Sequence, residues 1–132
     1  MENANKSWQV LFCDEEDKDC SIIEFLESLP KEGQVKVLKF LELLSKNGPQ
    51  LRRPYSDILY DGIHELRLRV GKIYARILYF FVYGNFIILQ SGFKKKTDRT
   101  PDKYVEQAIE YRNLIMEKYS EKDLEENLNA PI

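Results

Sequence analysis

Two arginines, Arg67 and Arg76, are expected to lie directly opposite each other on neighbouring strands. A two-residue hairpin turn at Gly71-Lys72 gives that register. Period-two alternation then puts both guanidinium groups on one face of the hairpin and apolar residues on the other. Like charges at such a pair repel each other. We therefore expect the pair to bind an anion, and our candidate is RNA phosphate.

Further basic and aromatic side chains are expected near the arginine pair. Guanidinium groups bind phosphate through two parallel hydrogen bonds and stay charged at any working pH. Aromatic rings give the bases of single-stranded RNA a surface on which to stack. The expected RNA-binding residues are Arg69, Lys72, Tyr74, Phe93 and Arg99.

Cleavage of RNA through its 2′-hydroxyl needs a base, charge stabilisation at the phosphate and an acid. The arginine pair suits the second role. A lysine crowded by other cations can have its pKa lowered toward neutrality, and a tyrosine near the start of the last helix offers a similar group. The sequence leaves open which group moves which proton. The expected catalytic residues are Arg67, Arg76, Lys94, Lys95, Lys96 and Tyr104.

A run of three lysines is, taken alone, more often a solvated turn than a catalytic device. The functional interpretation therefore depends on the register of the arginines. The charge distribution agrees with it, because residues 49–104 contain 11 basic and 5 acidic side chains, a net charge of +6. The flanking segments have a net charge of −4 each, and the 132 residues together −2. For nucleic-acid binding the local patch matters more than the total.

The length predicts a single domain, 1–132, with a flexible tail from about residue 121. Cys13 and Cys20 are expected to be packing residues or incidental thiols, since one histidine cannot complete a zinc site with them. The scattered aspartates do not support a metal cluster, so we expect no metal and no cofactor. Without a signal peptide or a long apolar run, a cytoplasmic protein with no membrane association is expected.

The element pattern predicts an α+β fold in the order β-α-α-β-β-β-α. A strand at residues 8–13 precedes two helices, one opening at Ser21 and one running from Pro30 to Asn47. They form a helical hairpin on one face of an antiparallel sheet. The last helix starts at Thr100-Pro101-Asp102, with the threonine hydroxyl as its cap, and partly covers the other face.

A second hairpin is expected around a turn at Gly84-Asn85. Its register pairs Val82 with Ile87 and, further along the strands, Arg76 with Phe93. This register puts several apolar residues on the arginine side of the sheet. We expect the last helix to cover that half and the half around the arginines to stay open.

Four segments resemble the RelE/HigB branch of bacterial toxin–antitoxin systems. They are Leu51 to Ile63, His64-Glu65-Leu66-Arg67, Tyr74 to Tyr79 (YARILY) and Gly92 to Thr97 (GFKKKT), followed by Thr-Pro and a helix. With the β-α-α start, the resemblance covers residues 8 to about 119. It implies a microbial RNase fold and metal-independent cleavage of mRNA on the ribosome, which blocks translation. It also implies a hetero-oligomer with a small helix-turn-helix antitoxin that neutralises the toxin.

Carried over by position, Arg67 and Arg76 match the phosphate-contacting arginines of this family. The lysines at 94–96 match its basic segment, and Tyr104 matches a tyrosine thought to activate the attacking hydroxyl. The chain has no histidine near the end of the sheet, as some members do, so the proton transfers stay unassigned. Two alternatives remain open: a non-catalytic toxin that binds a DNA topoisomerase, as ParE-like relatives do, and a non-catalytic RNA-binding module.

Overall fold

The computed structural model describes residues 7–14, 17 and 20–126. A five-stranded sheet runs through it in the order β1-β5-β4-β3-β2. In chain order the elements are β1 (Gln9–Phe12), α1 (Ile22–Ser28), α2 (Lys31–Asn47), the 3-10 turn η2 (Gly48–Gln50), β2 (Ser56–Ile58), β3 (His64–Val70), β4 (Ile73–Val82), β5 (Phe86–Lys94), α3 (Asp102–Lys118) and α4 (Glu121–Glu126).

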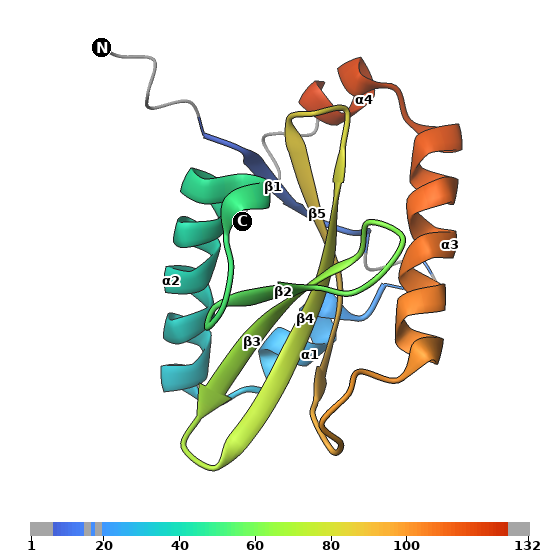
Figure 1. Ribbon diagram of the computed structural model, residues 1–132. Helices are drawn as coiled ribbons and strands as arrows, with labels where there is room; N and C mark the ends of the chain where they lie inside the picture. Colours follow the sequence, from blue (N-terminus) through green and yellow to red (C-terminus); the bar gives the residue numbers. More distant parts are fainter. Residues whose placement is uncertain (1–6, 15–16, 18–19, 127–132) are drawn as a thin grey trace.

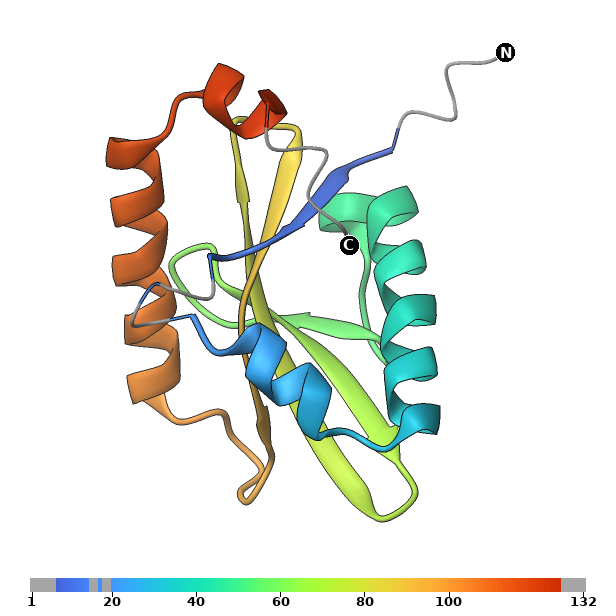
Figure 2. The ribbon, with the colours of Figure 1, turned by 180° about the vertical axis from the view of Figure 1, so that it is seen from behind.

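Helices cover both faces of this sheet, with α2 on one side and α3 on the other (Figure 1). The view from behind shows α1 crossing the sheet on the side away from α3 (Figure 2). The α+β class is therefore confirmed. Two details differ from the expectation: β1 pairs with β5 in parallel, and the segment before β3 contains the short strand β2. The sheet is thus antiparallel from β2 to β5 and mixed at β1.

The first hairpin has the predicted register. Val70 pairs with Ile73 around the turn, and Arg67 lies directly opposite Arg76. Gly71 has a φ of 61°, the left-handed conformation that such turns require and that glycine adopts without steric cost. The two arginines therefore share one face of the sheet.

The second hairpin keeps only part of its predicted register. Arg76 does pair with Phe93, but Val82 pairs with Phe86 and not with Ile87. A bulge on β5 accounts for the difference, because Gln90 is an extra residue there, opposite the step from Leu78 to Tyr79 on β4. The backbone carbonyl of Gln90 instead accepts a hydrogen bond from the Ser21 N–H, just before α1.

The last helix begins two residues beyond the predicted hydroxyl cap. Pro101 occupies the cap position, and no side chain caps the helix. The hydroxyl of Thr100 donates instead to the carboxylate of Glu65 on β3. The tail also differs from the expectation, since residues 121–126 form α4 and bury Leu124. The rest of the predicted tail, 127–132, lies outside the described residues.

The prediction for the two cysteines was wrong, because Cys13 and Cys20 form a disulfide. The pattern of two cysteines without a wider framework gave no sign of it. Cys13 directly follows β1 and Cys20 precedes α1, so the fold brings together the two ends of the short loop between them. No helix among the described residues is long and apolar enough to cross a membrane.

We predict that Gly92→Ala destabilises the fold. A Cβ atom at Gly92 would overlap Cδ2 and Cγ of Phe25, so the Phe25 ring on α1 must move away from β5. Such overpacking costs about 1–3 kcal/mol. Urea unfolding of Gly92→Ala and of the double variant with Phe25→Ala measures it. The added methyl should cost much less once the ring is gone, and an equal cost in both backgrounds would contradict the packing argument.

Candidate phosphate-binding site

A hollow of about 410 Å³ lies over the paired arginines on the α3 side of the sheet. We call it the arginine pocket. Five cationic side chains line it, and they come from the segment before β2, from β3 and β4, and from the loop that follows β5. The lining residues are Arg53, Pro54, Arg67, Leu68, Arg69, Tyr74, Arg76 and Lys95.

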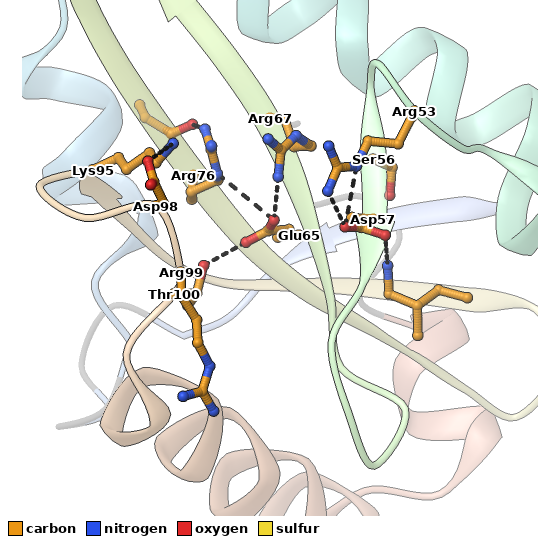
Figure 3. A network of polar contacts seen from close by, with 12 residues as sticks. Arg53, Ser56, Asp57, Glu65, Arg67, Arg76, Lys95, Asp98, Arg99 and Thr100 are labelled. Carbon is orange, nitrogen blue, oxygen red and sulfur yellow. Dashed lines mark hydrogen bonds and ion pairs between the residues drawn. The ribbon is translucent and has the colours of Figure 1, made fainter.

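The carboxylate of Glu65 connects the two arginines (Figure 3). Its Oε2 atom lies 2.8 Å from Nη1 of Arg67 and 3.7 Å from Nε of Arg76. Its Oε1 atom accepts the hydroxyl hydrogen bond of Thr100 at 2.5 Å. The repulsion expected between the arginines is thus offset by a carboxylate of the same chain. An external anion is not needed to explain the arginine pair, but the pocket remains cationic.

Arg76 is the most deeply placed of the cations in the arginine pocket. Only 3% of the residue is exposed, and its Nη1 donates to the carbonyl of Ala75. Burial and the nearby charge of Arg67 lower the pKa of Arg76, and Glu65 partly opposes them. The guanidinium group nevertheless stays charged at neutral pH. Removing it would therefore take a fixed positive charge from the floor of the pocket.

A second ion pair borders the arginine pocket on the side of β2. Arg53 donates to Oδ2 of Asp57 through Nε at 3.1 Å and Nη2 at 2.8 Å. Asp57 itself lies opposite Glu65 across the β2–β3 ladder. Partial burial alone would raise the pKa of Asp57, but hydrogen bonds from Arg53 and from the Ile58 N–H outweigh it. The pKa therefore lies below its ordinary value, and the carboxylate stays charged beside the arginines.

Tyr74 stands at the open rim of the arginine pocket. It is 45% exposed, and its ring centroid lies 5.1 Å from the guanidinium carbon of Arg69 and 5.7 Å from Nζ of Lys95. Lys95 also lies 3.9 Å from a carboxylate oxygen of Asp98. An exposed ring between two cations is suited to stack on a base whose phosphate the cations hold.

A second hollow, of about 300 Å³, adjoins the loop between β5 and α3. We call it the lysine pocket. One of its walls is a stacked pair of rings, Phe93 and Tyr104, with centroids 4.0 Å apart. Lys95 lines both pockets. The residues around the lysine pocket are Phe93, Lys94, Lys95, Lys96, Thr97, Arg99, Thr100, Pro101, Lys103 and Tyr104.

The structure brings together most of the side chains expected at the site. The arginine pocket contains five of them, and the lysine pocket contains the others except Lys72. Lys72 is exposed in the β3–β4 turn and lines neither pocket. Sequence reasoning missed three contributors: Arg53, Glu65 and Thr100. The sequence does give a sign of Glu65, because alternation along the strand places it on the same face as Arg67. Arg53 and Thr100 instead join the site through tertiary contacts.

His64 lines neither the arginine pocket nor the lysine pocket. It lies 8% exposed among aromatic rings on the α2 side of the sheet, stacked on Tyr79. Its Nδ1 atom has no hydrogen-bond partner among the described residues. Burial, and then the charge of Arg52, lower the pKa of His64, so the ring is neutral at pH 7. Within the described part of the chain, no group of three or more His, Cys, Asp or Glu residues could hold a metal ion.

The fold resembles that of a solved toxin. The free state of the E. coli toxin RelE, in a mutant form with two arginines replaced by alanine, aligns with a TM-score of 0.56 and 13% sequence identity. The alignment covers 80% of this chain and 97% of the toxin chain. At this identity the likeness establishes the fold.

The sequence establishes the family. Residues 24–113 match the model of the phage-derived Gp49-like proteins (DUF891), so the chain belongs to this family, which is of the RelE/HigB toxin type. The expected resemblance is therefore confirmed, and membership implies an antitoxin partner. No curated protein sequence matches the chain.

We predict that His64 makes the stability depend on pH. Its pKa is lower in the folded state than the ordinary value of 6.5, so the unfolded chain binds the proton more readily. The stability it contributes is present above about pH 6.5 and is lost as the pH falls below that value. Urea unfolding at pH 7.5 and 5.5 should show a smaller loss for His64→Gln than for the wild type. An equal loss would mean that other groups cause the dependence.

Proposed function

We propose that this chain is the toxin of a toxin–antitoxin pair and cleaves mRNA on the ribosome without a metal ion. Such an mRNA interferase blocks translation in the cytoplasm until its antitoxin, of the helix-turn-helix type, binds it. Cytoplasmic thiols are kept reduced, and the proposal does not depend on the Cys13–Cys20 disulfide because neither cysteine lines the arginine pocket or the lysine pocket.

One observation supports the proposal most strongly: the paired arginines at the floor of a pocket lined by five cations. Three carboxylates of the described residues pair with these cations, those of Asp57, Glu65 and Asp98. The pocket therefore keeps a net positive charge. Positively charged guanidinium groups that line such a hollow can stabilise the charge that develops on a phosphate during transfer.

The reaction that fits this pocket is attack of the ribose 2′-hydroxyl on the adjacent phosphorus. A base removes the 2′ proton, the bond from O2′ to phosphorus forms, and the bond from phosphorus to O5′ breaks. An acid then protonates the departing 5′ oxygen, which leaves a 2′,3′-cyclic phosphate and a 5′-hydroxyl. Arg67 and Arg76 stabilise the phosphate charge. Lys95, which lines both pockets, and Tyr104, which lines the lysine pocket, are the candidates for the proton transfers.

The ribosome supplies the orientation of the RNA strand that the pocket lacks. The arginine pocket is shallow and open at Tyr74, so by itself it holds a flexible RNA strand loosely. An mRNA fixed on the ribosome is already oriented, and fixed orientation contributes several orders of magnitude to a rate. We therefore expect cleavage of mRNA during translation and little cleavage of free RNA.

We predict that Arg67→Ala and Arg76→Ala each lower mRNA cleavage by about 10²–10³-fold, because each removes charge stabilisation at the phosphate. Lys46→Ala, an exposed change at the end of α2, is the control and should cleave at the wild-type rate. Circular dichroism and thermal melting check that each variant is folded. A folded Arg76→Ala variant with full activity would contradict the proposed mechanism.

Inducible expression in bacteria tests the function itself, with wild type beside Arg76→Ala and primer extension on an abundant mRNA. New 5′ ends within coding sequence, seen only with the wild type and only during translation, are the expected result. Growth arrest with intact mRNA would instead indicate a topoisomerase-binding toxin. Salt-dependent RNA binding without any cleavage would indicate an RNA-binding module.

The three lysines should contribute unequally. Lys95 is half-buried and lines both pockets, whereas Lys94 and Lys96 are exposed. A charge-assisted hydrogen bond is worth about 1.5–3 kcal/mol, so Lys95→Ala should lower the cleavage rate by about 10- to 100-fold. Lys94→Ala and Lys96→Ala serve as matched controls with smaller losses. Equal losses at all three positions would show that only the summed charge matters.

A further inference from the structure

We propose that Glu65 is the positioning residue of the arginine pocket. Through its two oxygens it fixes Arg67 and Arg76 toward one phosphate and ties them to the lysine-bearing loop through Thr100. That the phosphate belongs to RNA rests on the proposed function; the positioning itself does not.

Both arginines contact the same oxygen of Glu65. Oε2 of Glu65 contacts Arg67 on the same strand and Arg76 on the neighbouring strand. Glu65 is 3% exposed and its side chain is closely surrounded, so its rotamer is restricted by packing. Two long guanidinium side chains that would otherwise repel each other are thus held at one separation. Ordering them in advance removes an entropic cost from phosphate binding.

The second oxygen of Glu65, Oε1, contacts the loop between β5 and α3. Oε1 of Glu65 accepts a hydrogen bond from Thr100, which is itself 9% exposed. Thr100 lies near the end of the loop 95–101, which joins β5 to α3. The loop contains Lys95 and Lys96, and its other end is fixed by the backbone bond from Lys95 N–H to Tyr74. Glu65 therefore links the arginine pocket to the lysine pocket.

The place of Glu65 distinguishes a positioning role from a catalytic one. Glu65 is not among the residues that line either pocket. Its contacts are with the arginines and with Thr100, which lie between it and the hollows. A group in this place acts on the phosphate through Arg67 and Arg76. It is consequently a positioning residue, and its loss should affect the geometry of the arginines directly.

Three variants test this role. Glu65→Gln keeps the size of the side chain but removes its charge. Thr100→Val keeps the shape of the threonine but removes the hydroxyl, and Thr100→Ser restores the hydroxyl. If Glu65→Gln does not fold because Arg76 is left buried without its carboxylate, the two threonine variants still test the positioning role of Glu65.

The first readout does not depend on nuclease activity. In ¹⁵N-correlated spectra, the Nε–H signals of Arg67 and Arg76 should shift in Glu65→Gln and exchange faster with water. Those in Thr100→Val should move in the same direction by less, and Thr100→Ser should return them to the wild-type positions. Arginine signals that stay unchanged in Thr100→Val and Glu65→Gln would overturn the positioning role, whatever reaction the protein performs.

The second readout is cleavage in a translating extract, measured over a range of ribosome concentrations. Misplacing reacting groups by an ångström can cost ~100-fold in rate, so we expect the maximal rate of Thr100→Val to fall about 10- to 100-fold. The half-saturating ribosome concentration should change less than about threefold, since most binding contacts remain. Thr100→Ser should recover the rate. Loss of ribosome binding with an unchanged maximal rate would contradict the role, whereas no cleavage by the wild type would reject only the proposed function.

Discussion

Two guanidinium groups directly opposite each other on neighbouring strands repel, and in this protein the carboxylate of Glu65 offsets that repulsion. The arrangement of the arginine pocket depends on this contact. Removing one partner of a buried ion pair costs about 3–5 kcal/mol, because the remaining charge stays desolvated. The same burial that makes the contact costly to break also holds Arg76 in one place. Stability and the proposed phosphate binding therefore depend on the same three side chains.

The fold serves this cluster by dividing the sheet between two tasks. The α2 side is packed with apolar and aromatic side chains, among them Tyr79, which is fully buried. On the other side, α3 covers the half of the sheet nearest the second hairpin and leaves the arginine half open. The loop that leads into α3 then returns to the arginines through Thr100. The floor of the arginine pocket is formed by buried strand residues such as Arg76, whereas Tyr74 at its rim is exposed.

Much of this arrangement follows from local rules that the sequence displays. The turn at Gly71 fixes the register of Arg67 and Arg76, and alternation places Glu65 beside them. The rest depends on long-range contacts. The bulge at Gln90 shifts the second hairpin because the backbone there bonds to Ser21, 69 positions away in the chain. Thr100 has the sequence context of a helix cap, yet its hydroxyl bonds to a carboxylate on β3. The place of Arg53 in the arginine pocket likewise depends on segments that are apart in the chain. Cys13 and Cys20 are only seven positions apart, but two cysteines without a wider framework gave no sign that they pair.

The most direct test of the account is a structure of the protein on a ribosome whose mRNA has a 2′-deoxy nucleotide at the cleavage position. Without the attacking hydroxyl the strand stays whole in the site. We predict one backbone phosphate within hydrogen-bond distance of both Arg67 and Arg76, with Glu65 still bonded to them and a base against Tyr74. A phosphate bound elsewhere, with the arginine pocket empty, would contradict it.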